Sequence, residues 1–220
     1  MELPQRTMRE YCWSCFQPAF SCFCSWLNPF DPGVQFVILS HPIEAYKGIA
    51  TGRLSHMMLK GSALIIGQDY SDNEKLNAIL TDSKLFPVIL YPGRESLNLS
   101  NLSQEERLAS FPKDKKLAVI VIDGTWSTAR KTVHVSRNLQ SIPRICFTPT
   151  VGSNFRVRKQ PRPECTSTIE AIHHTLDLLK GPPTPRREYQ VHDRLLSTFE
   201  RMVSLRVDLA GGRRDKRRLT

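Results

Sequence analysis

The chain has 220 residues, which is enough for one domain that buries a hydrophobic core without disulfides. Hydrophobic residues make up 40% and charged residues 24%, as in globular proteins, and no apolar run approaches the ~18 residues that span a bilayer. The net charge of +10 favours a polyanionic partner, with nucleic acid as the first candidate, because no basic amphipathic helix indicates binding to a membrane surface.

Residues 1–33 form a cysteine-rich segment that ends in turn-forming residues at 28–33. Residues 1–10 contain no apolar stretch of the kind that a secretory signal needs, so we expect a protein that is not secreted. Four of the six cysteines lie within thirteen residues: Cys12, Cys15, Cys22 and Cys24. This cluster favours a structural, tetrahedral Zn²⁺ site over disulfides, with an iron–sulfur cluster or four reduced thiols as alternatives. We expect the aromatic residues among them to pack around the site: Phe16, Phe20 and Phe23.

Five apolar runs follow, and we expect each of them to form a strand. The runs are residues 35–40, 62–67, 86–91, 116–123 and 144–148. Several are apolar at every position, which is typical of parallel strands that are covered on both faces.

Helix signals alternate with these runs. Three pairs have the spacing of a capping box at a helix start: Ser71 and Glu74, Ser103 and Glu106, and Ser167 and Glu170. The third helix is expected to end at Gly181 and Pro182, and a last helix to cover residues 195–203. The alternation predicts an α/β fold with a mainly parallel sheet and helices on both faces.

The chain therefore divides into a zinc-binding segment with four cysteines at residues 1–33, a main domain at 34–208 and a basic tail at 209–220. The tail is rich in cations: Arg213, Arg214, Lys216, Arg217 and Arg218. Such a tail is either a disordered, solvated segment or an arm that binds phosphates.

Polar residues directly follow two of the predicted strands. Asp123 ends the fourth run, at the carboxyl end where α/β sheets bind ligands, and Trp126 lies three residues later. Gly124 permits a sharp turn, and Thr125 is suited to cap the next helix. Residues 41–44 follow the first run in the same way. From the residues alone, Asp123 is equally well interpreted as a helix cap, with Trp126 in the core.

Two pairs of residues are interpreted as structural. His173 and His174 diverge by about 100° around a helix, so we expect one to face the core and the other the solvent, rather than both to share a metal ion. Cys146 and Cys165 are expected to be buried small hydrophobes.

Taken in order, these motifs resemble the DTW-domain family of tRNA-uridine aminocarboxypropyltransferases. The resemblance covers residues 11–180 and rests on the four cysteines and six motifs: H-P-x-E at 41–44, T-G-R-L at 51–54, L-Y-P-G at 90–93, D-x-T-W at 123–126, R-x-R at 156–158 and S-T-x-E-A at 167–171. Ala50 and Phe155 depart from the pattern, which has asparagine and tyrosine there; these departures concern individual polar contacts to ligand or RNA.

The resemblance implies a SPOUT-like domain with a C-terminal trefoil knot. It also implies transfer of the 3-amino-3-carboxypropyl group of S-adenosylmethionine to N3 of a tRNA uridine, with release of 5′-methylthioadenosine. Asp123 would act as general base or orient the uracil, because N3 must lose a proton. The cofactor would be bound by Leu90, Tyr91, Pro92, Gly93, Thr125, Trp126, Ser167, Thr168 and Glu170, of which Glu170 is equally well interpreted as a capping-box partner. The tRNA phosphates would be bound by Arg53, Arg130, Lys131, Arg156 and Arg158.

Two other functions stay open at this point. A SPOUT-like RNA methyltransferase would use the same co-substrate, and a zinc-containing RNA-binding protein without activity would need the basic side chains but not Asp123. Ribosomal RNA is the alternative to tRNA. We expect a cytoplasmic location, with the nucleus as the alternative, and no membrane partner; the sequence does not indicate an oligomeric state.

Overall fold

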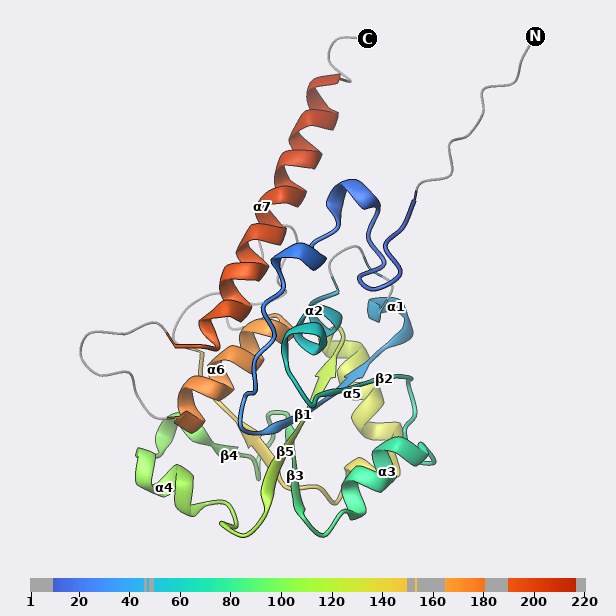
Figure 1. The fold of residues 1–220 in the computed structure, drawn as a ribbon. Coiled ribbons are helices and arrows are strands. Elements are labelled where there is room, and N and C mark those ends of the chain that lie inside the picture. The colour runs from blue at the N-terminus through green and yellow to red at the C-terminus, as the bar shows by residue number, and fades with distance from the viewer. Residues whose placement is uncertain are drawn as a thin grey trace.

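One parallel sheet forms the centre of the protein. The structure, a computed structural model, describes residues 10–45, 47, 50–149, 153, 165–180 and 190–216, with side chains up to residue 209. Within these residues six strands pair in the order β2-β1-β5-β3-β6-β4, and all five pairings are parallel (Figure 1). The strands are β1 (Gln35–Ser40), β2 (Ala63–Ile66), β3 (Leu85–Leu90), β4 (Leu97–Asn98), β5 (Lys116–Asp123) and β6 (Arg144–Cys146). The predicted mainly parallel sheet is confirmed.

The central strands are apolar at successive positions because they contribute to a hydrophobic cluster on each face of the sheet. In β1, Phe36 and Ile38 lie in one cluster, whereas Val37 and Leu39 lie in the other. Since side chains alternate along a strand, only a sheet covered on both faces buries four consecutive apolar residues.

Helices cover both faces (Figure 1). On the face of Phe36 lie α2 (Thr51–Met58), α6 (Thr168–Lys180) and α7 (Asp193–Lys216). On the face of Val37 lie α3 (Glu74–Thr81) and α5 (Trp126–Val135). The shorter elements are α1 (Pro42–Ala45), α4 (Gln104–Ala109) and four 3₁₀ turns, η1 (Ala19–Ser21), η2 (Cys24–Trp26), η3 (Leu99–Asn101) and η4 (Arg137–Leu139).

The capping box predicted at Ser103 and Glu106 is confirmed at the start of α4. The one predicted at Ser71 is wrong, because Asn73 caps α3 by accepting a hydrogen bond from the Leu76 N–H. The hydroxyl of Ser71 instead donates to Asp69 at 2.7 Å, so it is already engaged in a local turn.

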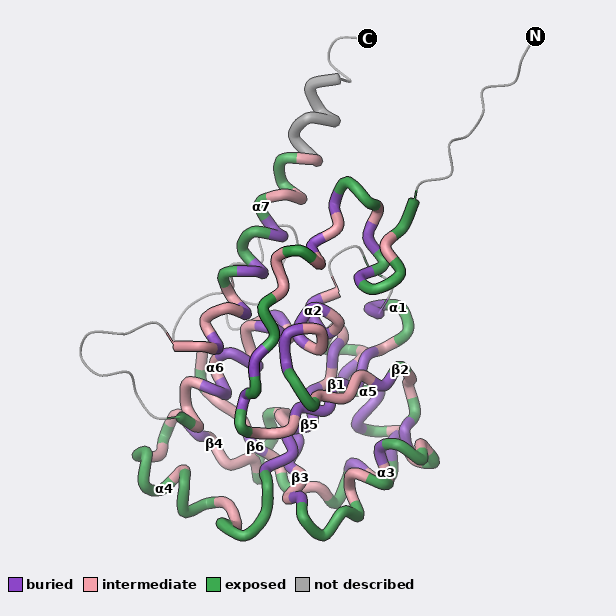
Figure 2. Tube along the Cα trace, viewed as in Figure 1, coloured by how far each residue is buried: buried purple, intermediate pink, exposed green. Residues whose placement is uncertain are grey.

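The cysteine-rich segment shares the core of the sheet. Cys15 and Phe23 are buried in the same cluster as Phe36. The expectation that Phe16 and Phe20 also pack around the cysteines is wrong, because these side chains are 42% and 64% exposed. Cys15 and Phe23 instead face the core, and Figure 2 shows exposed, intermediate and buried positions alternating along this segment.

Some expectations fall on the edge of what the structure describes. α7 continues past residue 208, where the tail is predicted to begin, and ends at Lys216; residues 217–220 lie outside the described part. The predicted knot involves the chain after β6, and residues 150–152 and 154–164 also lie outside it. Of the helices that are described, none combines the length and the apolar character needed to traverse a bilayer.

Candidate active site and metal centre

Asp123 ends β5 at the carboxyl edge of the sheet and is 4% exposed. Its Oδ2 accepts a hydrogen bond from Ser40 Oγ at 2.8 Å, and its Oδ1 accepts one from Thr168 Oγ1 at 2.6 Å. Thr51 Oγ1 lies 3.5 Å from Oδ1, at the limit of a hydrogen bond. Hydroxyl groups from β1, α2 and the start of α6 therefore converge on one buried carboxylate.

These donors offset the cost of burying the carboxylate, since a buried polar group needs hydrogen-bond partners. Tyr70 lies directly behind it, fully buried, and donates its hydroxyl to the carbonyl oxygens of Gly67 and, at longer distance, of Ser40. Burial raises the pKa of Tyr70, and the charge of Asp123 raises it further. Tyr70 therefore stays a neutral donor that supports the end of β1.

Gly52 brings α2 against this carboxylate. A Cβ atom at this position would lie 2.5 Å from Asp123 Oδ2 and 2.6 Å from its Cγ, so no larger residue fits without displacing the acid. The helix N-terminus, where unpaired N–H groups and the helix dipole favour anions, thus lies next to Asp123.

The predicted cofactor-binding residues lie on, or directly beside, three loops at the same edge of the sheet: Leu90 ends β3, Trp126 begins α5, and Thr168 and Glu170 lie in the first turn of α6. The rings of Tyr91 and Trp126 are 6.5 Å apart, and Trp126 Nε1 donates to Cys165 Sγ at 2.8 Å. Thr125 caps α5 by accepting a hydrogen bond from the Thr128 N–H. At the end of β3, Leu90 is half-buried, whereas Pro92 and Gly93 in the loop that follows are exposed.

Glu170 forms hydrogen bonds with the segment that leads into α6 and with Ser153. Its Oε2 accepts hydrogen bonds from the backbone N–H and hydroxyl of Ser167, at 2.7 and 2.6 Å, and from the hydroxyl of Ser153 at 2.6 Å. Glu170 thus acts as the capping-box partner, one of its two expected roles; contact with the cofactor stays a prediction. Cys165, two residues before Ser167, is buried as expected. Cys146, which was also expected to be buried, is only half-buried.

A hollow of about 370 Å³ adjoins the loop that follows β3. It is lined by Arg94, Glu95, Gln140, Ser141, Ile142, Pro143 and Arg144. The Arg144 guanidinium lies 5.7 Å from the centre of the Tyr91 ring. Arg94 and Arg144 were not among the predicted site residues; Arg94 lies three residues after the predicted strand 86–91, and Arg144 is the first residue of the predicted strand 144–148.

Ser40 and Thr51 were not predicted as partners of Asp123, although both donate to its carboxylate. Ser40 pairs with Asp123 in the register of β1 and β5. A polar residue that ends an otherwise apolar strand was the available signal for Ser40, and Thr51 begins the T-G-R-L motif.

The residues predicted to bind RNA are distributed over different surfaces. Arg130 and Lys131 are exposed on α5. Arg53 is half-buried; its guanidinium donates to the Ala45 carbonyl at 3.4 Å and lies 4.2 Å from the centre of the Phe16 ring. Arg156 and Arg158 lie outside the described residues.

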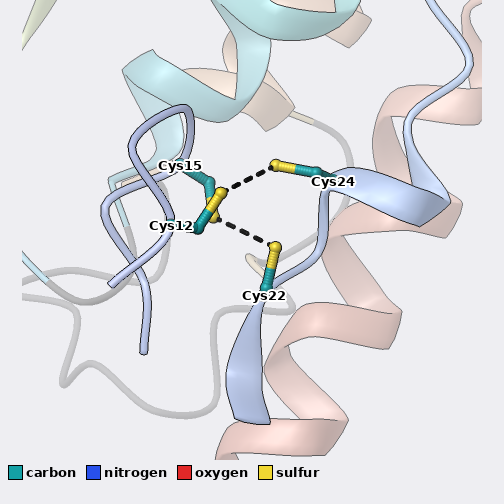
Figure 3. A group of neighbouring side chains, drawn as sticks. All are labelled: Cys12, Cys15, Cys22 and Cys24. Atoms are coloured by element: carbon teal, nitrogen blue, oxygen red, sulfur yellow. Dashed lines mark hydrogen bonds between the residues drawn. The ribbon is translucent and has the colours of Figure 1, made fainter. Parts of the chain in front are cut away.

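The four clustered cysteines point toward one another (Figure 3). The Sγ atoms of Cys12 and Cys24 are 3.6 Å apart, those of Cys15 and Cys22 are 3.7 Å apart, and all four lie within 4.8 Å. These distances exclude disulfides, in which the sulfurs are about 2.05 Å apart. They match the edge of about 3.8 Å of a tetrahedron of sulfurs around a zinc ion with bonds of about 2.3 Å. The cluster is therefore compatible with zinc.

The local backbone also suits a metal centre. The N–H groups of Cys15 and Ser14 point at Cys12 Sγ and lower its pKa to about 6. Burial raises the pKa of Cys15 and of Cys24, and the neighbouring thiols add to the effect. A cation would offset the cost of gathering four thiolates, and four protein ligands leave no open position, which is typical of a structural site.

A second polar cluster joins α6 to α7. The two ring nitrogens of His173 lie 2.7 Å from Asp193 and 3.4 Å from Asp177, and His192 Nε2 lies 2.7 Å from Asp177. Separations of 2.7 Å are hydrogen bonds, shorter than the ~3.3 Å between two ligands of one tetrahedral zinc ion. His173 faces the core as one of the two adjacent histidines was expected to, while His174 is half-buried against Phe147, with ring centres 4.5 Å apart.

Known proteins resemble this chain over most of its length. The protein named tRNA-uridine aminocarboxypropyltransferase 2 is 28% identical in Macaca fascicularis (176 residues; 78% of this chain, 57% of the relative) and 29% in Mus musculus (177 residues; 78% and 57%). The Drosophila melanogaster protein of that name is 26% identical over 187 residues, or 81% and 70%. The chain thus spans little more than half the length of the mammalian relatives. No solved structure matches it. The DTW domain matches residues 9–207, and the chain therefore belongs to the DTW-domain family.

Proposed function

We propose that this chain is a tRNA-uridine aminocarboxypropyltransferase, which transfers the 3-amino-3-carboxypropyl group of S-adenosylmethionine to N3 of a uridine and releases 5′-methylthioadenosine. The observation that carries the proposal is the buried Asp123 carboxylate, which hydroxyl groups from three elements hold at the carboxyl edge of the sheet. Membership of the DTW-domain family and the names of the relatives support this choice.

The three loops at this edge fit the proposed co-substrate. S-adenosylmethionine supplies a sulfonium that activates three carbon atoms, and the carbon that reacts is the one aimed at the nucleophile. Tyr91 and Trp126 offer aromatic surface, and the guanidinium groups of Arg94 and Arg144 suit a carboxylate. We assign to these loops the binding and orientation of the ligand.

Asp123 has two candidate duties, orientation of the base and acceptance of its proton, and the contacts of Oδ1 suit both. Oδ2 is bound by Ser40 at 2.8 Å, whereas Oδ1 is bound by Thr168 and only weakly by Thr51. A stronger donor can therefore replace Thr51 at Oδ1. We assign to this oxygen the hydrogen bond from uracil N3–H and acceptance of that proton.

We further propose that Cys12, Cys15, Cys22 and Cys24 bind a structural zinc ion, whose tetrahedral sulfur geometry their spacing matches. tRNA is the proposed partner, and the net charge of +10 and the exposed Arg130 and Lys131 support binding of its phosphates. The cytoplasm, or the nucleus, is the compartment in which such a substrate is available.

Incubation with S-adenosylmethionine and unmodified tRNA tests the proposal. We expect methylthioadenosine and an N3-modified uridine, both identified by mass spectrometry. Formation of S-adenosylhomocysteine and a methylated base would instead identify a methyltransferase. tRNA binding that is unchanged in Asp123→Ala, together with no binding of S-adenosylmethionine in calorimetry, would identify an RNA-binding protein without activity.

A further inference from the structure

Among the residues that the structure describes, exposed aromatic side chains gather in two places. Four lie between residues 11 and 20: Tyr11 at 55% exposed, Trp13 at 89%, Phe16 at 42% and Phe20 at 64%. The fifth, Trp126, is 46% exposed and follows Asp123 by three residues. The other large hydrophobic residues that are exposed in the described part are aliphatic. We refer to residues 11–20 as the aromatic loop.

The exposure of the aromatic loop is not explained by the lack of an interior. Cys15, within the loop, and Phe23, just after it, are almost fully buried and belong to the core of the sheet. An exposed tryptophan gives up the hydrophobic stabilisation that burial of its large surface would bring. Clustered exposed rings of this kind mark an interaction surface.

Hydrogen bonds hold the backbone of the loop in a defined turn. The Cys12 N–H donates to the Gln17 carbonyl and the Phe16 N–H to the Cys12 carbonyl, both at 2.8 Å, and Tyr11 forms an antiparallel bridge with Pro18. Cys12 and Cys15 bracket Trp13 and anchor its turn in the sulfur cluster (Figure 3). Because the backbone is already ordered, binding through these rings loses little conformational entropy.

Arginines surround the loop and indicate the chemistry of its partner. Arg53 lies 4.2 Å from the ring of Phe16, Arg201 lies 4.2 Å from the ring of Trp26, and Arg206 donates to the side chain of Gln17. Guanidinium groups bind phosphates, and aromatic faces stack on bases. Exposed rings with Arg53 and Arg206 in contact with the same loop therefore favour single-stranded nucleic acid over an apolar protein surface.

Three consecutive residues connect the aromatic loop to the candidate active site. Thr51 and Gly52 contact the carboxylate of Asp123, and Arg53 contacts Phe16. Figure 1 shows the cysteine-rich segment next to α1 and α2, the elements that follow β1 at the carboxyl edge of the sheet. If an RNA nucleotide is bound at Asp123, the nucleotides next to it in the RNA strand lie toward the aromatic loop.

We propose that the aromatic loop is a nucleotide-stacking surface, on which Trp13 and Phe20 bind unpaired bases that flank the modified uridine. Proteins recognise RNA loops mainly through such unstacked bases. The identity of the RNA as tRNA and the presence of a modified uridine rest on the proposed function, whereas the stacking surface itself does not.

Binding of RNA to the full chain tests the surface directly. The affinity for unmodified tRNA, measured by fluorescence anisotropy, is expected to fall about tenfold or more in Trp13→Ala/Phe20→Ala, because each stacked base is lost. Trp13→Phe keeps a stacking face and is expected to stay within about threefold of the unchanged chain. Leu108→Ala is the matched control, since this apolar side chain is 53% exposed on α4. Equal loss in the Leu108 control, or no loss in the double variant, overturns the proposal.

Crosslinking of the unaltered chain avoids any effect of substitution on folding. tRNA that contains 4-thiouridine is irradiated with the protein, and the crosslinked peptides are identified by mass spectrometry. We expect crosslinks within residues 11–20. Crosslinks confined to other segments overturn the proposal.

The transfer assay separates this proposal from the proposed function. If no methylthioadenosine forms but the double variant loses tRNA binding, the surface stands and the transferase assignment fails. If transfer occurs and the double variant keeps the unaltered KM for tRNA, the surface fails and the transferase assignment stands. Binding to phosphatidylserine vesicles that the double variant abolishes, with RNA binding unchanged, would overturn the proposal in favour of a membrane contact.

Discussion

Asp123 is held through both of its carboxylate oxygens, so its charge matters as well as its shape. In Asp123→Asn the amide nitrogen can only donate, and it faces a hydroxyl that now also donates. We expect the transfer rate to fall at least about a hundredfold, since a proton acceptor and an anion are lost together. Single-turnover formation of methylthioadenosine measures this rate. Asp72→Asn, at a side chain that is 92% exposed, serves as control, and an active Asp123→Asn enzyme would exclude Asp123 from the chemistry.

The close approach of Gly52 to Asp123 leads to a second prediction about a single residue. Gly52→Ala places a Cβ atom 2.5 Å from Asp123 Oδ2, so either α2 or the carboxylate must move. We expect a loss of about 1–3 kcal/mol in the free energy of unfolding, as for other overpacked sites, together with reduced transfer. Urea denaturation and the transfer assay measure the two effects. Lys60→Ala, at an exposed position just after the same helix, should change neither; a fully active Gly52→Ala protein would show that the close approach is not needed.

At the scale of elements, the histidine–aspartate network fastens α6 to the start of α7. His173 is buried with carboxylates at both ring nitrogens, so its removal leaves Asp177 and Asp193 without this partner. We expect His173→Asn to lower the free energy of unfolding by about 1–3 kcal/mol, the usual cost of leaving buried hydrogen-bonding groups without a partner. His174→Asn is the matched control, because His174 packs on Phe147 beside the network. Equal urea midpoints for the two variants would mean that the network contributes no stability.

The elements that could be predicted are those whose pattern is local. β1 and β5 have the predicted bounds, because runs that are apolar on both faces can lie only inside a sheet. β4 has two residues and no pattern to detect. Either Ser71 or Asn73 could cap α3 by accepting a hydrogen bond from its first turn. The hydroxyl of Ser71 is engaged with Asp69, and Asn73 is therefore the cap.

The site shows the same division between local and long-range information. Asp123 was predictable because it ends an apolar strand. Its hydrogen bond with Ser40 was not, because that contact requires β1 to lie next to β5, and the order of strands in the sheet cannot be deduced from the sequence. The exposure of Phe16 and Phe20 depends on how the cysteine-rich segment folds against the rest of the chain. Packing that joins distant residues could not be deduced from spacing along the chain.

At the scale of the whole molecule, the cysteine cluster contributes to the stability of the entire domain, because Cys15 and Phe23 share its core. We expect one zinc ion per chain by elemental analysis. Removal of the metal by a chelator, or Cys15→Ser, is expected to lower the melting temperature by about 5 °C or more. Cys146→Ser, outside the cluster, is the control. Iron in place of zinc, or a melting temperature that is indifferent to the chelator, would contradict this prediction.

The net charge of +10 makes the affinity for tRNA depend on salt. If Arg130 and Lys131 contact phosphates, their replacement by alanine should lower the slope of log affinity against log salt by about 1.5, with similar loss for all tRNAs. Lys113→Ala/Lys115→Ala alters exposed cations just before β5, near the opposite edge of the sheet, and provides the control. An unchanged slope in the Arg130/Lys131 variant would place the phosphates on another surface.

The hydroxyl groups around Asp123 come from positions 83 residues before it and 45 residues after it in the chain. During synthesis, the carboxylate therefore leaves the ribosome long before Thr168, and the nascent chain cannot close the site until α6 has emerged. A product that terminates early, before residue 165, keeps an acid at the edge of an apolar sheet with Oδ1 lacking its shortest hydrogen bond. The catalytic edge of the sheet is thus completed only when the segment that contains Thr168 has been added to the chain.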